Sequence, residues 1–414
     1  MDALETKRLL GFQPLPGRIK SDYDDFVVDE VPLYEPSGQG THTYFLVEKR
    51  GLSSAQAAQD VARALGRLQR EIGLAGLKDA RALTRQWMSI EHVPPEHLRG
   101  LRIPRLRILQ ATLHTNKLRI GHLSANRFMI RVRDTDTTRL EELRSAFMTL
   151  HKLGAPNYFG PQRFGSRGDT WLIGREVIRG NLPAALDQLL GRPSAVDTGE
   201  ILRARELYDA ERYAEALPHW PRLFREERRA LGALIRRPTA RKRAFLAIPQ
   251  ATRNLYVSAF QSRLFNQVVQ ERIESLARLE AGDLAWLHRS GAVFEVVDPA
   301  AEQERADRFE ISPTGPLFGH RMTWPQGLPG AVERRALEES GVTVDAFRSP
   351  YLRVKGARRP LRFRADDPDM ALGADARGSY IELRFTLPRG CYATSLLREF
   401  FQAAPAGDHN KPAE

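Results

Sequence analysis

The chain has 414 residues, of which 42% are apolar and 28% are charged, and 63 Lys and Arg against 51 Asp and Glu give a formal charge of +12. This composition is typical of a soluble globular protein of two or three domains. The single cysteine, Cys391, excludes a disulfide framework, and the ten histidines show no metal-ligand spacing, so we expect no metal. No run of 18 apolar residues occurs, so we expect a cytoplasmic protein with no membrane partner. The positive charge makes a polyanion the leading candidate partner.

The first third of the sequence contains strand signals and one clear helix. Two short runs of β-branched and aromatic residues, Phe26–Val28 and Tyr44–Val47, are bounded by Gly, Pro and Ser and predict strands. Ser53 begins a capping box, and apolar residues at helical spacing end before Gly66, so a helix is predicted between them. A later strand with a basic face is predicted because three apolar residues alternate with three arginines: Phe128, Ile130 and Val132 with Arg127, Arg131 and Arg133.

The middle of the chain has a mostly helical pattern from about residue 172 to residue 243. Between Arg222 and Arg253, ten Lys and Arg stand against two Glu, which is a local excess of +8. We expect this basic segment to offer phosphate contacts. A long helix is predicted to follow, with Ser258 near its start, and a strand-like patch covers residues 293–297.

The clearest strand in the sequence alternates apolar and polar residues from Tyr380 to Leu387, and a turn then leads into a helix from about Ala393. Strand-rich ends around a helix-rich middle predict an inserted domain, because the two outer segments must return to one sheet. From Ala403 onward the sequence is rich in Ala, Pro and charge without periodicity, so we expect a disordered tail.

Sequence signatures of dinucleotide binding, of phosphate-binding P-loops and of serine hydrolases do not occur in the chain. A loop between the first helix and a predicted strand instead places Asp79 among cations and hydroxyl or amide donors, in the sequence GLKDARALTRQ at residues 76–86. Taken alone, a Lys-Asp pair in a turn is usually a solvated turn whose carboxylate accepts backbone hydrogen bonds.

Three further blocks carry aromatic residues, glycines or arginines in close succession. Residues 154–165, GAPNYFGPQRFG, form a tight loop whose aromatics either seal a domain junction or stack on unpaired bases. Residues 124–128, SANRF, open the basic-faced strand, where Phe128 is more often a core residue than a ligand platform. Residues 387–399, LPRGCYATSLLRE, comprise a strand end, a glycine turn and a capped helix, and their plain interpretation is structural.

Taken in their order along the chain, the four blocks at residues 76–86, 124–128, 154–165 and 387–399 resemble the TruD family of tRNA pseudouridine synthases. Two more segments extend the resemblance, KSDYDDFVVDE at residues 20–30 and AFQSRLFN at residues 259–266, so that it covers residues from about 18 to 400. The sequence departs from the family pattern at three positions, where Ala80 replaces a basic residue, Ala125 replaces a glycine and Asp169 replaces an asparagine.

The resemblance implies an α+β fold. Its catalytic domain contains a mixed, largely antiparallel sheet and is interrupted by a helix-rich α/β insertion domain of the TruD type. We expect the catalytic domain to comprise residues 1–153 and 353–402, the insertion domain residues 154–352, and the disordered tail residues 403–414.

The resemblance also implies an isomerase that converts a uridine of tRNA, at position thirteen of the D arm, to pseudouridine. Matched to the family motifs, Asp79 is the nucleophilic aspartate and Lys20 its cationic partner. Four further residues would line the pocket for the target uridine: Phe26, Asn126, Phe128 and Tyr392.

This reaction breaks the bond between N1 and C1′, rotates the uracil and joins C5 to C1′, so it needs neither a redox cofactor nor a metal. The carboxylate could act as a nucleophile or as a base that removes a sugar proton, and the sequence leaves both routes open. Lys20 would keep it ionised while Phe128 stacks on the ring. Two other classes stay open, an RNA-binding or RNA-folding factor of the same architecture and a structural component of a ribonucleoprotein. The oligomeric state is unknown, and a monomer is compatible with the sequence.

Overall fold

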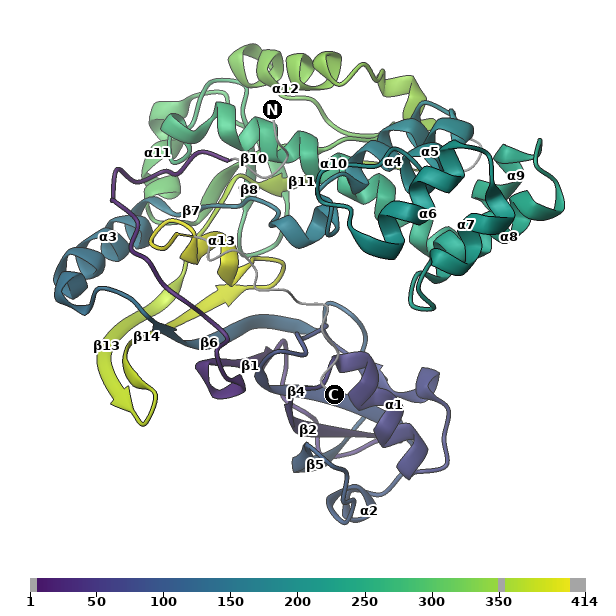
Figure 1. The fold of residues 1–414 in the computed structure, drawn as a ribbon. Coiled ribbons are helices and arrows are strands. Elements are labelled where there is room, and N and C mark those ends of the chain that lie inside the picture. The colour runs from purple at the N-terminus through teal and green to yellow at the C-terminus, as the bar shows by residue number, and fades with distance from the viewer. Residues whose placement is uncertain (1–5, 349–353, 403–414) are drawn as a thin grey trace. The chain divides into compact units, whose positions relative to one another are not determined.

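The computed structural model describes residues 6–348 and 354–402 (Figure 1). The chain divides into two compact units. Of the described residues, the sheet unit comprises residues 10–155 and 363–402, and the helical unit comprises residues 6–9, 156–348 and 354–362. The predicted disordered tail from Ala403 lies outside the described residues, and the predicted domain bounds stay a prediction. No helix within the described ranges is long and apolar enough to cross a membrane.

An eight-stranded sheet forms the centre of the sheet unit. Its strands are β1 (Phe26–Pro32), β2 (His42–Arg50), β3 (Gly73–Leu74), β4 (Leu83–Glu91), β5 (Leu106–His114), β6 (Leu123–Arg133), β13 (Asp366–Asp375) and β14 (Gly378–Pro388). The strand order is β13-β14-β6-β1-β4-β2-β5, with β3 paired to β4. Strands β1 and β4 pair in parallel, and the other neighbours pair antiparallel. The predicted mixed, largely antiparallel sheet is confirmed.

The two alternating strands predicted from the sequence, β6 and β14, are neighbours in this sheet, and Phe128 lies opposite Phe385. The apolar residues of β14 are buried, as the alternation predicts. On their face of the sheet, α3 (Leu140–Leu153) contributes Phe147, whose ring lies 6.1 Å from that of Phe385 and 5.2 Å from that of Phe400. Phe400, near the end of the described chain, therefore belongs to the same aromatic core as Phe128 and Phe385.

The predicted first helix is α1 (Ser54–Ala64), and the hydroxyl of Ser53 caps it by accepting a hydrogen bond from Gln56 N at 3.1 Å. Gly66 follows the helix with φ +65°, the left-handed conformation that glycine adopts without cost. Buried residues of α1 pack against β2 and β4 in a second apolar cluster. The short helices α2 (Pro95–Arg99) and α13 (Ala393–Leu397) belong to the same unit.

The prediction of a basic face on β6 is wrong for two of its three arginines. The guanidinium of Arg133 is 4% exposed and donates to the carboxylates of Asp25, at 2.7 and 2.8 Å, and Asp375, at 2.7 and 2.9 Å. Arg131 donates to Glu382 at 3.0 Å, and Arg127 remains exposed. The carboxylates come from segments distant in sequence, so the alternation within β6 alone could not show that the charges are neutralised. The two hydrogen bonds from Arg133 hold the pKa of Asp375 below its usual range.

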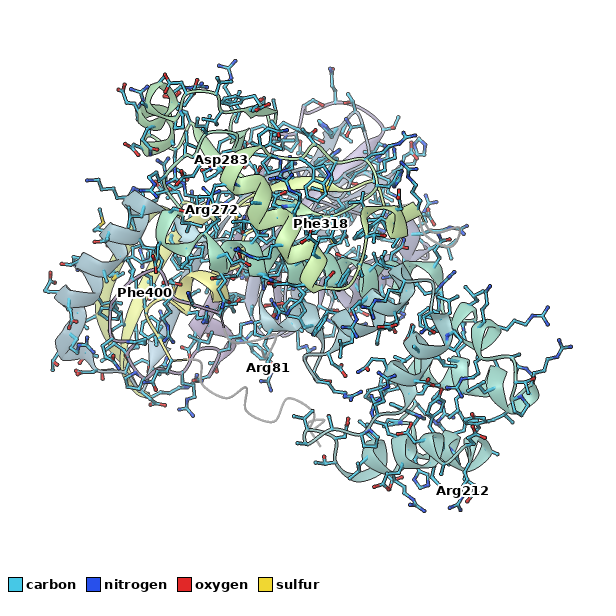
Figure 2. All side chains as sticks on the ribbon, turned by 90° about the horizontal axis from the view of Figure 1, so that it is seen from above. Arg81, Arg212, Arg272, Asp283, Phe318 and Phe400 are labelled. Carbon is cyan, nitrogen blue, oxygen red and sulfur yellow. The ribbon has the colours of Figure 1, made fainter. Side chains whose placement is uncertain are left out.

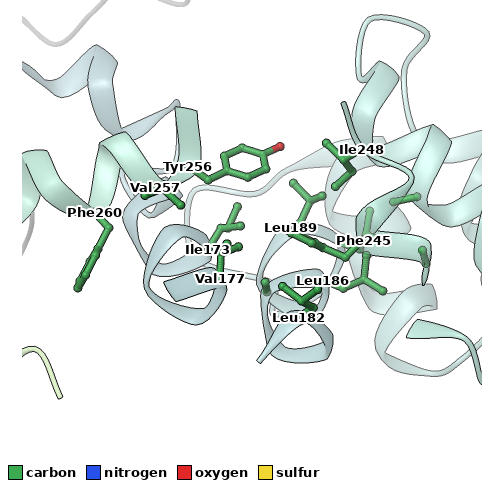
Figure 3. Packing of buried hydrophobic residues seen from close by; sticks show 14 of the residues in the cluster. Ile173, Val177, Leu182, Leu186, Leu189, Phe245, Ile248, Tyr256, Val257 and Phe260 are labelled. Atoms are coloured by element: carbon green, nitrogen blue, oxygen red, sulfur yellow. The ribbon is translucent and has the colours of Figure 1, made fainter. Parts of the chain in front are cut away.

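The helical unit contains the predicted run of helices. Its helices are α4 (Thr170–Ile178), α5 (Leu182–Leu190), α6 (Gly199–Asp209), α7 (Tyr213–His219), α8 (Arg225–Arg236), α9 (Arg241–Leu246), α10 (Gln250–Glu271), α11 (Pro299–Asp307) and α12 (Gly327–Glu339). Apolar residues of α4 to α10 and of α12 form one core, and Figure 3 shows those of α4, α5 and α10 facing each other. The long helix α10 starts eight residues before Ser258, directly after Pro249, which lacks the backbone N–H that a preceding turn would need.

A smaller sheet accompanies these helices in the order β11-β10-β8-β9. Its strands are β8 (Leu284–Leu287), β9 (Val293–Glu295), β10 (Ile311–Leu317) and β11 (Ala357–Pro360). Two further strands of two residues each, β7 (Ala155–Pro156) and β12 (Arg362–Phe363), pair with each other outside this sheet. The end of α10 is tied to the start of β8 by a buried ion pair between Arg272 and Asp283, with N–O distances of 2.9 and 3.1 Å (Figure 2).

The basic segment between Arg222 and Arg253 falls on α8, α9 and the start of α10. Several of its arginines are used inside the unit: Arg241 pairs with Asp187 and bonds the hydroxyl of Tyr208, and Arg228 donates to two backbone carbonyls. The exposed cations of the segment are Arg222, Arg225, Arg229, Arg236, Arg237, Lys242 and Arg243. These seven residues are the most accessible to a polyanion, and part of the +8 excess is used for contacts inside the unit.

We expect Arg133→Met to lower the free energy of unfolding by about 3–5 kcal/mol, because it leaves the carboxylate of Asp25 buried without its partner. The double variant Arg133→Met with Asp25→Asn removes the buried charge as well and should recover part of this loss. Denaturant unfolding of the three proteins measures both effects. A single-variant loss below about 1 kcal/mol, the value typical of surface pairs, would contradict a central role for this ion pair.

Candidate active site

The structure brings Lys20 and Asp79 into direct contact. The ammonium of Lys20 lies 2.8 Å from the carboxylate oxygen Oδ2 of Asp79, and the two side chains are 23% and 58% exposed. Asp79 is on the loop between β3 and β4, and Figure 2 labels Arg81 on the same loop. A carboxylate that is more than half exposed on a loop can reach a substrate atom, either as a nucleophile or as a base.

Lys20 is held in an unusual backbone conformation, with φ +58°. A residue with a Cβ pays about 1–2 kcal/mol for this left-handed region, so the segment must be anchored on both sides. Before Lys20, Arg18 and Arg133 exchange two backbone hydrogen bonds, of 2.8 and 2.9 Å. After it, the side chain of Asp22 accepts a hydrogen bond from Asp24 N at 3.2 Å and caps a short helical turn. These anchors aim the ammonium at Asp79.

An aromatic group lies beside this ion pair. The ammonium of Lys20 is 4.3 Å from the centre of the Phe26 ring, and the ring of Phe26 meets that of Phe128 edge to face at 6.0 Å. Phe128 in turn stacks on Phe385 at 5.4 Å. Both Phe26 and Phe128 are buried in the absence of a substrate, so Phe128 is part of the core whether or not it also contacts a ligand.

Asn126 and Tyr392 lie on neighbouring parts of the sheet unit. Asn126 is two residues before Phe128 on β6, so the two side chains share one face of the strand. Its amide oxygen is buried and has no hydrogen-bond partner among the residues that the structure describes. Its register partner on β14 is Leu387, and half-buried Tyr392 follows five residues later, at the N-cap of α13. An unpartnered buried oxygen calls for an explanation, and a bound ligand is one.

A buried lysine supports the Asp79 loop, and the sequence reasoning missed it. Lys49 of β2 is 0% exposed, and its ammonium donates to the backbone carbonyls of Leu52 and, at 3.2 Å, Asp79. Burial lowers the pKa of Lys49 to about 8, with the charge of Asp79 acting against this shift and that of Lys78 adding to it. The signal was available, because Lys49 continues the core-facing alternation of Phe45 and Val47, where a charge is unexpected.

The residue before Asp79 is fastened by a second set of buried polar contacts. Lys78 forms an ion pair with Glu30, whose other oxygen accepts a hydrogen bond from Trp87 N at 3.0 Å. Burial raises the pKa of Glu30, and the charge of Lys78 opposes this shift. The hydroxyl of Ser54 accepts from Lys78 N at 2.8 Å and donates to Gln86 at 2.7 Å. The backbone on both sides of the Asp79 carboxylate is therefore fixed by buried groups.

The aromatic block at residues 154–165 serves the helical unit. The side chain of Asn266 on α10 accepts a hydrogen bond from Phe159 N at 2.8 Å and donates to Phe159 O at 2.9 Å. The ring of Phe159 meets that of Phe265 edge to face at 5.5 Å. These contacts attach the glycine-rich loop to the long helix α10.

Across residues 6–348 and 354–402, no three His, Cys, Asp or Glu side chains come close enough to hold a metal ion.

Wild-type protein should gain stability relative to Lys49→Met as the pH rises from about 8 to about 10.5. The folded state has the lower lysine pKa, so over this interval the unfolded chain binds more protons and unfolding becomes harder. Below pH 8 the buried lysine is protonated in the folded state as well as in the unfolded state. The extra free energy of unfolding that the wild type gains at higher pH is therefore absent there. Denaturant unfolding between pH 7 and pH 10 measures the difference. Lys49→Arg, which stays charged over this range, is the control. If the difference in unfolding free energy between the wild type and Lys49→Met did not change with pH, the lowered pKa would be contradicted.

Comparisons with known proteins identify the family of the chain. The family model "TruD: tRNA pseudouridine synthase D (TruD)" matches residues 6–400. The chain is 46% identical over 385 residues to a tRNA pseudouridine synthase D of Geobacter metallireducens, covering 92% of this chain and 94% of that one. It is 43% identical over 384 residues to the protein of the same name from Geobacter sulfurreducens, covering 92% and 93%.

A solved structure shares the fold. The crystal structure of a putative tRNA pseudouridine synthase D from Methanosarcina mazei superimposes with a TM-score of 0.79 at 27% identity, covering 97% of this chain and 95% of that one. The family, the α+β fold class and the isomerase class predicted from the sequence are confirmed. The chain belongs to the TruD family of tRNA pseudouridine synthases.

Proposed function

We propose that this protein isomerises the uridine at position thirteen of the tRNA D arm to pseudouridine, with Asp79 as the reacting carboxylate. The observation that carries the proposal is the ion pair between Lys20 and Asp79 at an exposed point of a loop whose neighbouring backbone is fixed by buried groups. A reacting group held in one orientation avoids much of the entropic cost of a reactive encounter.

In the proposed reaction the bond between C1′ and N1 breaks, the uracil turns within the site, and C5 bonds to C1′. C5 loses one proton and N1 gains one, so the product is an isomer of the substrate. The reaction involves no net oxidation or reduction. Asp79 reacts either with the sugar or base as a nucleophile or with a sugar C–H as a base. Lys20 holds the carboxylate in place through both routes.

The remaining candidates would hold the target base after it leaves the RNA stack, which costs a few kcal/mol. The buried amide of Asn126 offers an unsatisfied hydrogen-bonding group of the kind that reads the edge of a uracil. Phe26, Phe128 and Tyr392 would supply the aromatic walls of the pocket, with Phe128 on the same face of β6 as Asn126. The chemistry requires no cofactor or metal, and we place the enzyme in the cytoplasm with tRNA as its partner.

Asp79→Asn should abolish pseudouridine formation, because the amide keeps the size of the side chain but is neither a nucleophile nor a base. RNA binding should survive, since phosphate contacts and base stacking supply most of the affinity. The assay incubates an unmodified tRNA transcript with each protein and measures pseudouridine and affinity in parallel. Asp134→Asn is the matched control, because Asp134 is an exposed ion-paired aspartate of the same unit.

Appreciable turnover by Asp79→Asn would remove this carboxylate from the mechanism. A wild-type protein that binds tRNA tightly but forms no product would instead favour an RNA-binding or RNA-folding factor.

Mapping pseudouridine in total tRNA with and without the gene tests the target position. We expect the signal at position thirteen to disappear in the deletion strain and to return when the wild-type gene, but not the Asp79→Asn gene, is restored. Loss of a signal elsewhere in tRNA, with position thirteen unchanged, would refute the assignment of the D arm while preserving the reaction.

A further inference from the structure

A groove of about 940 Å³ lies on the sheet unit, between the end of β2, the start of β4 and the segment that joins α2 to β5. Five arginines line it: Arg50, Arg99, Arg102, Arg105 and Arg107. The acidic residue in its lining, Glu48, accepts a hydrogen bond from Arg85 at 2.9 Å and shares this cation with Asp29, so it offsets only part of the charge of the five arginines. The groove is therefore strongly cationic.

Most of these arginines have no anionic partner in the part of the chain that the structure describes. Within the described residues, an ion pair with a carboxylate is absent for four of them: Arg99, Arg102, Arg105 and Arg107. Arg99 and Arg105 instead each donate to a backbone carbonyl, at 2.6 and 2.9 Å. A guanidinium has five N–H donors, so these bonds orient the groups and leave donors for a ligand. In contrast, Arg50 is paired with Asp22 and Asp24.

The groove is hydrogen bonded to the segment that supports the Asp79 loop. Arg50 N donates to Arg105 O at 3.0 Å, and Gly51 N donates to Ala82 O at 3.2 Å, three residues after Asp79. Leu83, the next residue, lines the groove itself. A strand bound in the groove would therefore run close to the loop that carries the reacting carboxylate.

We propose that this groove binds the phosphodiester backbone of the tRNA strand that flanks the target uridine. The proposal rests on the proposed function. Guanidinium groups bind phosphate oxygens with two parallel hydrogen bonds, and four of them without carboxylate partners would meet several phosphates of one strand. The charges are spread along nine residues, from Arg99 to Arg107, which fits a chain of phosphates better than a single small anion. Apolar residues between them, such as Ile103 and Leu106, would contact ribose or base surfaces.

The test compares the salt dependence of tRNA binding for the wild type and the triple variant Arg102→Gln, Arg105→Gln, Arg107→Gln. Losing three phosphate contacts should lower the slope of log affinity against log salt by about 2, which corresponds to an affinity about 100-fold weaker at 0.1 M salt. kcat/KM for an unmodified tRNA transcript should fall with it. A second variant with Lys at the same three positions keeps the charge and should retain most of the slope.

The control variant removes three cations from α3 and its N-cap, Arg139→Gln, Arg144→Gln, Lys152→Gln, and should leave the slope unchanged. α3 contacts β13, and β13 and β5 are the opposite edges of the sheet. An unchanged slope in the groove variant, or an equal change in both variants, would overturn the proposal. Failure of the proposed function would show differently, as a wild-type protein that makes no pseudouridine, and the binding slopes would still decide whether the groove holds RNA.

Discussion

The Asp79 loop depends on charged groups that are buried beneath it. Lys49 binds its backbone carbonyl and the pair of Lys78 with Glu30 holds the preceding residue, all with little access to water. Burying such groups is costly unless they are hydrogen bonded, so each of them gains its favourable energy only when the loop takes one conformation. The loop can thus leave the Asp79 carboxylate exposed without leaving its backbone free to move.

The segment around residues 18–30 organises the rest of the sheet unit. It supplies Lys20, then Asp22 and Asp25, which pair with Arg50 and Arg133, and finally β1, which lies between β6 and β4. β6 carries Asn126 and Phe128, and the Asp79 loop leads into β4. This short segment therefore lies between the strand that carries Asn126 and Phe128 and the strand that follows the Asp79 loop. The pairing of these strands in the sheet fixes the distance between the ion pair and the aromatic rings.

Sequence patterns correctly predicted the strands and helix ends that depend on neighbouring residues. Alternation identified β6 and β14, and capping residues identified the limits of α1, because these signals act over a few residues. The partners of charged residues were not predictable in this way. Arg133 meets Asp25 and Asp375, which are 108 and 242 residues away in the sequence, and Lys49 meets a carbonyl 30 residues away. Asp79 and Lys20 were named through resemblance to a family, and the structure adds their contact.

The pairing of β6 with β14 has a consequence for synthesis of the chain. β14 begins 245 residues after β6 ends, so at typical ribosomal speeds of about 5–20 residues per second β6 waits roughly 12–50 s for this neighbour. During that interval one edge of β6 is open, and unpaired edges invite association with other chains. A prematurely terminated product would lack the strand that closes this edge and the core around Phe385. The strand whose edge stays open during synthesis is the one that carries Asn126 and Phe128.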